Sequence, residues 1–236
     1  MPTQKTTPSS TPNNKVTTFP IVGIGASAGG LEAFEQFFHV IPADSGMAFV
    51  LIPHLDPSHA SLLVDILQRA TKIPVIEAED QMSVQPDHVY IIPPNRDMEI
   101  LHGELQLNVP ATPRGQRLPI DSFLRSLADD QQENAIAIIL SGTGSDGTQG
   151  ARSVCGAGGI IMVQEPVSAK YEGMPNSVIH AGYATHVLPA DKMWGALQFC
   201  THQLSRHEAT RSTAEKTSGI KRVLIQLRSI TGHDFS

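Results

Sequence analysis

The chain has 236 residues, of which 40% are hydrophobic and 17% charged, and its formal net charge at pH 7 is -6. This composition favours one soluble globular domain, and the acidic balance excludes a basic surface for nucleic acid. No apolar run approaches the roughly 18 residues that a membrane-spanning helix needs. The two cysteines, Cys155 and Cys200, suggest neither a disulfide framework nor a metal-ligand pair, so a reducing, cytoplasmic setting is expected.

Apolar runs and helical patterns alternate along the chain between two polar ends. Residues 1–18, rich in Ser, Thr, Pro and Asn, predict a disordered tail that also lacks the apolar core of a secretory signal. Strands are predicted over 21–25, 47–54, 74–78, 88–93, 135–142, 159–164 and 184–189. Helices are predicted over 30–40, 58–70, 121–132, 148–157 and 191–205. One folded domain is therefore expected to span 19–204, followed by a linker and helix over 205–236.

This alternation predicts an α/β fold, with a doubly wound, mostly parallel sheet and helices on both faces. The strand runs are short and rich in Ile and Val, as is typical of strands covered on both sides. Residues 98–108 break the rhythm, because a His-Gly centre with alternating flanks predicts a β-hairpin. We therefore expect a mixed sheet. In such sheets, ligands bind beyond the carboxyl ends of the strands.

The first predicted strand leads into a loop of small residues that has two interpretations. Gly23-x-Gly25-x-x-Ala28 fits the dinucleotide fingerprint, in which amides at a helix start hold a pyrophosphate. Gly25-x-Ser27-x-Gly29 fits the elbow in which a sharp strand-to-helix turn exposes a nucleophilic serine. The first interpretation predicts a nucleotide-dependent oxidoreductase, and the second predicts a serine hydrolase.

Two later loops favour the hydrolase. A dinucleotide site predicts an acidic residue at the end of the second strand, but that strand ends in His54, and Asp56 follows inside the loop. Parallel strands about 4.8 Å apart could bring His54 within reach of Ser27, and histidine is well suited to accept a serine proton near neutral pH. Asp146 follows the strand over 135–142 in a glycine-rich turn and supplies the carboxylate of a triad.

Each of these residues also has a purely structural interpretation. Small residues after a first strand allow close packing of a helix, and a histidine at a strand end can be a structural hydrogen-bonding residue. An aspartate before glycine is often a turn residue or helix cap. His54, Asp56 and His59 could be imagined as metal ligands, but HLDPSHASLL fits better as a loop that enters a capped helix.

In their order and combination, the three loops resemble the catalytic domain of chemoreceptor protein-glutamate methylesterases, the CheB family. IGASAGG resembles the nucleophile loop with Ser27, PHLDPSH the histidine loop with His54, and LSGTGSDGTQG the aspartate loop with Asp146. The resemblance runs from about Phe19 to about Leu204. It includes VYIIPPNRDMEI, LPIDSFLRSLA and QEPVSAKYEGMPNSVIHAG.

The resemblance implies hydrolysis of glutamyl methyl esters on cytoplasmic helices of chemoreceptors, with no metal or organic cofactor. Deamidation of receptor glutamines is a further activity of the family. Ala28 and Thr143 stand where the family often has threonine and methionine, but their backbone amides could still serve as oxyanion donors. The candidates for the substrate rim are Arg96, Tyr171, Gly173 and Met174.

Two further expectations concern the role of the domain in a larger protein. SGIKRVLIQLRSITGHDFS resembles a linker helix that enters a receptor methyltransferase domain, as in fused methylesterase–methyltransferase proteins. The changes at Ala28 and Thr143 leave open a catalytically silent domain of the same fold that docks receptors or regulates an attached enzyme.

Overall fold

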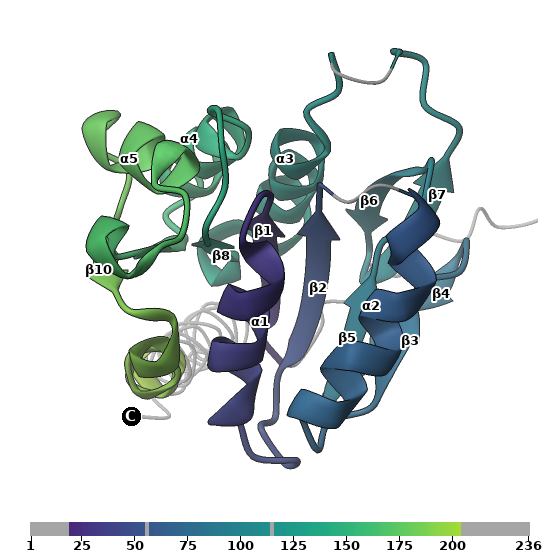
Figure 1. Cartoon of the computed structure of the whole chain (residues 1–236), viewed down its shortest axis with the longest axis horizontal. Coiled ribbons are helices and arrows are strands. Elements are labelled where there is room, and N and C mark those ends of the chain that lie inside the picture. The colour runs from purple at the N-terminus through teal and green to yellow at the C-terminus, as the bar shows by residue number, and fades with distance from the viewer. Residues whose placement is uncertain (1–18, 55–56, 114–115, 204–236) are drawn as a thin grey trace, which may run out of the picture. The chain divides into compact units, whose positions relative to one another are not determined.

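The structure is a computed structural model that describes residues 19–54, 57–113 and 116–203, with residues 57–61 by their backbone alone (Figure 1). The chain divides into two units, Met1–Asp191 and Lys192–Ser236, and the candidate site lies wholly in the first. The predicted tail over 1–18 and the predicted linker and helix over 205–236 lie outside the described residues.

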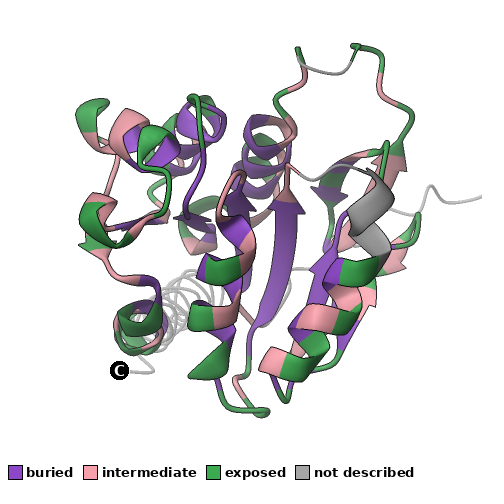
Figure 2. Ribbon diagram, in the orientation of Figure 1, coloured by how far each residue is buried: buried purple, intermediate pink, exposed green. Residues whose placement is uncertain are grey.

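A seven-stranded sheet with the order β10-β9-β8-β1-β2-β5-β3 forms the centre of the first unit. Its neighbouring strands pair in parallel. Every residue of the central strands β1 and β8 is buried, which fits their Ile-rich and Ala-rich sequences and their cover on both faces (Figure 2). The strands are β1 (Ile21–Ala26), β2 (Ala48–Pro53), β3 (Val75–Glu77), β5 (His88–Ile91), β8 (Ile136–Ile139), β9 (Ile160–Gln164) and β10 (His186–Leu188).

Helices cover both faces of this sheet, which confirms the predicted doubly wound fold. The helices α1 and α2 contact each other on one face, and α3 and α4 contact each other on the other face (Figure 1). The α-helices are α1 (Gly30–His39), α2 (Pro57–Ala70), α3 (Pro119–Gln131), α4 (Thr148–Gly156) and α5 (Gly173–His180). Short 3-10 turns span Gln132–Asn134, Pro166–Ser168 and Ala190–Lys192, and in the second unit residues 193–203 are helical.

Close packing of α3 on β1 explains the glycines of the first strand. A Cβ atom at Gly25 would lie 2.4 Å from Cγ2 of Ile120, and one at Gly23 would lie 2.8 Å from Cδ2 of Leu124. Only glycine leaves room for the helix at these two positions. The helix start is thereby held beside the carboxyl end of β1.

The predicted hairpin is present, but the expectation of a mixed sheet is wrong. The strands β6 (Asp97–Leu101) and β7 (Glu104–Asn108) join β4 (Met82–Ser83) in a separate antiparallel sheet of order β4-β7-β6. Residues along β6 alternate between buried (Met98 and Ile100) and exposed (Leu101). The hairpin therefore buries only one face, unlike the central strands of the large sheet, which are buried on both faces. One face of the hairpin packs on α3, where the Ile100 amide donates to Oγ of Ser126 at 3.0 Å.

The helix α5 was not predicted from the sequence. Pro175 is the third residue of this helix, where its missing N–H removes no bond because first-turn amides have no intrahelical partner. Met174 and Val178, four residues apart, are both buried and place one face of the helix in the core. Among the described residues, no helix combines the length and apolar character that crossing a bilayer requires.

Candidate active site

Ser27 follows directly after β1, at the point where the strand order of the sheet reverses. β1 lies between β2, which follows it in the chain, and β8, which the chain reaches only after the small sheet and α3. Such switch points leave a crevice beyond the carboxyl ends of the strands, where open α/β sheets bind ligands. The Ser27 amide donates to the Ser141 carbonyl at 2.9 Å, which ties the serine to the loop that follows β8.

The parallel register places Ser27 and His54 side by side at this edge. Ala26 and Pro53 are paired in the ladder, so the two site residues are the next residues on adjacent strands. The His54 amide donates to the Ala26 carbonyl at 2.8 Å and extends the ladder by one step. Both side chains are half-buried. Among the described residues, no hydrogen bond joins the Ser27 hydroxyl to the imidazole, and apo sites of this type tighten when substrate binds.

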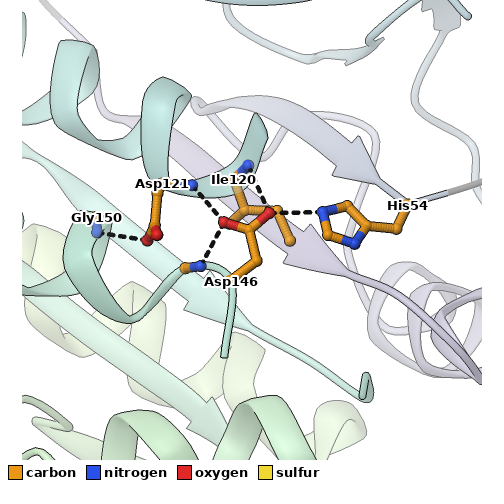
Figure 3. A network of polar contacts seen from close by, with 6 residues as sticks. His54, Ile120, Asp121, Asp146 and Gly150 are labelled. Atoms are coloured by element: carbon orange, nitrogen blue, oxygen red, sulfur yellow. Dashed lines mark hydrogen bonds and ion pairs between the residues drawn. The ribbon is translucent and has the colours of Figure 1, made fainter. Parts of the chain in front are cut away.

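His54 and Asp146 form a direct contact. Nε2 of His54 lies 2.5 Å from Oδ2 of Asp146 (Figure 3). The carboxylate side chain is 3% exposed and the imidazole 28% exposed, so the carboxylate lies beneath the surface while the ring reaches solvent. Because Nε2 is bound to Asp146, Nδ1 is the imidazole nitrogen that remains to accept a proton.

Backbone amides hold the Asp146 carboxylate in place. Oδ1 accepts from the amides of Asp121 at 2.9 Å and Gly147 at 2.8 Å, and Oδ2 accepts from the Ile120 amide at 3.1 Å (Figure 3). Ile120 and Asp121 lie in the first turn of α3, which begins at Pro119. Their amides have no partner within the helix and form an anion site at its positive end.

Asp121 is a second buried carboxylate that sequence reasoning did not identify. It is 4% exposed, and its Oδ1 accepts from the Gly150 amide at 2.7 Å, so it joins the starts of α3 and α4. Burial raises the pKa of Asp121 above its usual 3.8, the Gly150 amide lowers it, and the charge of Asp146 raises it further. An acidic residue in a first helical turn is common near the positive helix end, so the sequence alone gave no signal that it supports Asp146.

The two predicted oxyanion donors lie on loops that adjoin Ser27. Ala28 is half-buried, Thr143 is exposed, and among the described residues neither backbone amide donates a hydrogen bond. The residue before Thr143 packs tightly against Ser27, the predicted nucleophile, since a Cβ atom at Gly142 would lie 2.9 Å from Cβ of Ser27 and 2.2 Å from Sδ of Met174. The Thr143 amide therefore follows a residue that touches Ser27.

The four predicted rim residues have different surroundings. Tyr171 is 44% exposed and Gly173 is exposed, whereas Met174 is fully buried beneath Gly142. The Gly142 amide donates to the Tyr171 carbonyl at 3.0 Å, and the Met174 amide donates to the Gly142 carbonyl at 2.9 Å. This segment is thus tied to the loop after β8, and its contact with substrate stays a prediction.

Arg96 is exposed in the connection between β5 and β6. That connection leaves the carboxyl end of β5, which neighbours β2 in the sheet. No hydrogen bond or ion pair joins Arg96 to the other site residues in the described part of the chain. No group of three or more His, Cys, Asp and Glu side chains in the described part is placed to hold a metal ion. The side chains of Asp56 and His59 lie outside it.

Comparisons with known proteins identify the family of this chain. The family model described as CheB methylesterase matches residues 22–197. A protein-glutamate methylesterase/protein-glutamine glutaminase of Trichodesmium erythraeum is 33% identical over 177 residues, which cover 73% of this chain and 50% of that protein. A similarly named protein of Pseudomonas aeruginosa is 31% identical, over 77% of this chain and 53% of its own length.

The fold comparison covers an experimental structure almost completely. The crystal structure of the Thermotoga maritima CheB methylesterase catalytic domain matches with a TM-score of 0.71 and 31% identity, over 77% of this chain and 98% of that chain. The chain spans about half the length of the two curated relatives described above. The match of the family model over most of the chain, together with these relatives, shows that the chain belongs to the CheB methylesterase family.

Proposed function

We propose that this domain is a serine hydrolase that removes methyl esters from glutamate side chains of chemoreceptors. The observation that carries the proposal is the hydrogen bond between His54 and Asp146 at the strand end beside Ser27. Family membership supports the same reaction, because two relatives are named as protein-glutamate methylesterases. A serine, a histidine and a buried carboxylate in this order are the parts of a nucleophilic triad.

In the proposed mechanism, Oγ of Ser27 attacks the ester carbonyl carbon while Nδ1 of His54 accepts the hydroxyl proton. Asp146 holds the imidazole through Nε2–H and stabilises the positive charge that forms on the ring. The oxygen of the tetrahedral intermediate is stabilised by the backbone amides of Ala28 and Thr143. These amides act on charge that develops only along the reaction, so they lower the barrier without tightening substrate binding.

Collapse of the intermediate breaks the bond to the methoxy oxygen, which takes the proton from His54 and leaves as methanol. The glutamyl group then remains as an ester on Ser27. Water attacks this acyl-enzyme as His54 removes its proton, and Ser27 recovers a proton as the free carboxylate leaves. The reaction consumes one water and produces methanol, a glutamate carboxylate and one proton, with no metal or organic cofactor in any step.

The substrate, location and domain partner are part of the same proposal. The glutamyl esters lie on cytoplasmic helices of chemoreceptors, and the domain acts in the cytoplasm. The glutaminase in the names of the relatives supports a second activity on receptor glutamines, in which ammonia replaces methanol as the leaving group. A methyltransferase domain fused beyond residue 236 would produce the esters that this domain removes.

Two other functions were considered from the sequence. The nucleotide interpretation loses support because the packing of α3 already accounts for Gly23 and Gly25. A silent docking domain of the same fold has no specific observation in its favour, since the imidazole and carboxylate are in contact and adjoin Ser27.

Replacement of the nucleophile tests the proposal. Ser27→Ala should lower methanol release from a methylated receptor fragment by about 10⁶-fold, and a fluorophosphonate should no longer label the protein. Ser145→Ala is the matched control, because Ser145 is an exposed serine one residue before Asp146. Its variant should release methanol at the wild-type rate. Methanol release by Ser27→Ala within tenfold of wild type would overturn the proposal.

A further inference from the structure

Ser141 is a buried serine that the proposed reaction does not use. It lies two residues after the end of β8 and is 1% exposed. Its hydrogen bonds reach β9, the turn at Ser27 and the loop at Tyr171. Its amide donates to Oε1 of Gln164 at 2.8 Å, and its carbonyl accepts from the Ser27 amide at 2.9 Å. The backbone of Ser141 is thus fixed on one side by β9 and on the other by the nucleophile turn.

The hydroxyl of Ser141 connects two loops that the backbone does not connect. Oγ donates to the Ala28 carbonyl at 2.8 Å and accepts from the Tyr171 amide at 3.0 Å. The same loop is tied a second time, because the Gly142 amide donates to the Tyr171 carbonyl. The Tyr171 carbonyl, at 3.4 Å, is a second and longer acceptor for the same hydroxyl, so the shorter bond to the Ala28 carbonyl is the stronger one.

These bonds enclose the peptide that carries the proposed oxyanion donor. The peptide before Ser27 is fixed through its N–H, which donates to the Ser141 carbonyl. The peptide after Ala28 is fixed through its C=O, which accepts from the Ser141 hydroxyl. The peptide between Ser27 and Ala28 carries the Ala28 N–H; its own C=O accepts from the Gly30 amide at 2.9 Å, and it has a flanking anchor on each side. Both anchors come from one residue.

We infer that Ser141 is a positioning residue whose hydroxyl orients the Ala28 amide toward the oxyanion and couples the nucleophile turn to the loop at Tyr171. The inference rests on the proposed hydrolase function and assigns that function a residue outside the triad. Loss of the hydroxyl leaves the Ser27 amide bonded but frees the Ala28 carbonyl. The bond from the Gly30 amide to the Ser27 carbonyl remains, so the variant loses one restraint on this peptide and the Ala28 N–H can tilt from the direction that the transition state requires.

Ser141→Ala should therefore lower kcat for methanol release on the order of ten- to a hundredfold, less than the complete loss of an oxyanion donor. KM should change less than threefold, because the affected amide binds charge that forms only in the transition state. The rate at which a fluorophosphonate labels Ser27 should fall in parallel with kcat, since its phosphoryl oxygen occupies the same position. Ser141→Thr, which keeps a hydroxyl, should recover most of the lost rate.

Ser126 provides a matched control for the loss of a bridging hydroxyl. Its Oγ donates to the Phe123 carbonyl at 2.8 Å and accepts from the Ile100 amide at 3.0 Å, the same pair of distances as at Ser141. The bond from Ile100 joins the small sheet to α3, and the bond to Phe123 lies within α3. Ser126→Ala should lower the melting temperature about as much as Ser141→Ala does and leave kcat unchanged.

The outcomes separate this inference from the proposed function. If wild type releases methanol and Ser27→Ala does not, while Ser141→Ala keeps kcat within twofold of wild type, the positioning role is wrong and the hydrolase stands. An equal loss of kcat in Ser126→Ala would also overturn the positioning role, because the loss of activity would then follow the loss of stability. A wild-type protein that neither releases methanol nor reacts with a fluorophosphonate would overturn both.

Discussion

His54 and Asp146 are 92 residues apart in the chain, and Nε2 of the imidazole lies 2.5 Å from Oδ2 of the carboxylate. The sheet supplies this proximity, because His54 follows β2 and Asp146 lies in the loop beyond β8, with β1 between them. The amides at the start of α3 then fix the carboxylate. Four predictions test the contacts that hold these side chains and the neighbouring loops in place.

Asp146→Asn should reduce kcat by about 10⁴-fold, the size of loss that removal of a triad carboxylate produces when it leaves the wrong imidazole tautomer. Every oxygen of Asp146 accepts from a backbone N–H, so an NH₂ group in place of one oxygen faces a donor. Kinetics of methanol release measure the effect. Asp44→Asn, at an exposed aspartate, is the control and should match wild type. A loss of less than tenfold in Asp146→Asn would contradict the assigned role.

Gly142→Ala should displace Ser27, the proposed nucleophile. The added Cβ would lie 2.2 Å from Sδ of Met174 and 2.9 Å from Cβ of Ser27. Methionine can move, but Cβ of Ser27 moves only with its backbone. We expect a loss of activity of roughly 100-fold and a stability cost of about 1–3 kcal/mol.

Gly156→Ala is the control for Gly142→Ala. A Cβ atom at Gly156, the last residue of α4, meets nothing within 4 Å. The substitution should raise the free energy of unfolding by up to about 1 kcal/mol and leave activity unchanged. Urea denaturation and ester hydrolysis measure both variants. Wild-type activity in Gly142→Ala would show that the loop after β8 does not constrain Ser27.

Gly29→Ala and Gly46→Ala form a matched pair that separates backbone strain from collision. Their φ angles are 71° and 70°, so alanine at either position should cost about 1–2 kcal/mol of stability. A Cβ atom at Gly46 meets nothing within 4 Å, whereas one at Gly29 would lie 2.7 Å from Oγ of Ser141. Only Gly29→Ala should therefore lower kcat. Equal activity in the two variants would contradict a role for this contact.

Asp121 should make stability depend on pH. Burial raises its pKa above 3.8 in the folded state, so the folded protein binds the proton more tightly than the unfolded chain. The contribution of Asp121 to the free energy of unfolding should then fall as the pH rises from 3.8 through the raised pKa. Asp121→Asn keeps an oxygen for the Gly150 amide and removes the titration. Denaturation at a series of pH values should show a shallower decline for Asp121→Asn, and parallel profiles would refute this.

Much of the site could be predicted because its residues are adjacent to strands that the sequence marks clearly. Ser27, His54 and Asp146 each follow an Ile-rich or Val-rich run, and parallel strands end at one edge of the sheet. The predicted strand positions agree with the structure to within a few residues. Local sequence therefore defined the strands, and the rule for parallel sheets placed the three loops together.

What could not be predicted depends on contacts between distant segments. Asp121 and Ser141 are ordinary polar residues in sequence, and only the packing of α3 on β1 and the course of the loop after β8 give them their partners. The helix α5 was missed because Gly173 and Pro175 are typical of a loop. The separate small sheet was missed because β4 has only two residues. A two-residue strand leaves no periodic signal.

The pairing of Ala26 with Pro53 makes the spacing between the serine and the histidine a property of the sheet. This pairing involves β1 and β2 alone, and the connection between β7 and α3 belongs to neither strand. Protein engineers could therefore graft a foreign segment in place of this connection to redirect the domain to another ester-bearing protein. Because strand pairing positions Ser27 and His54, such a chimera should keep the proposed serine–histidine pair in place.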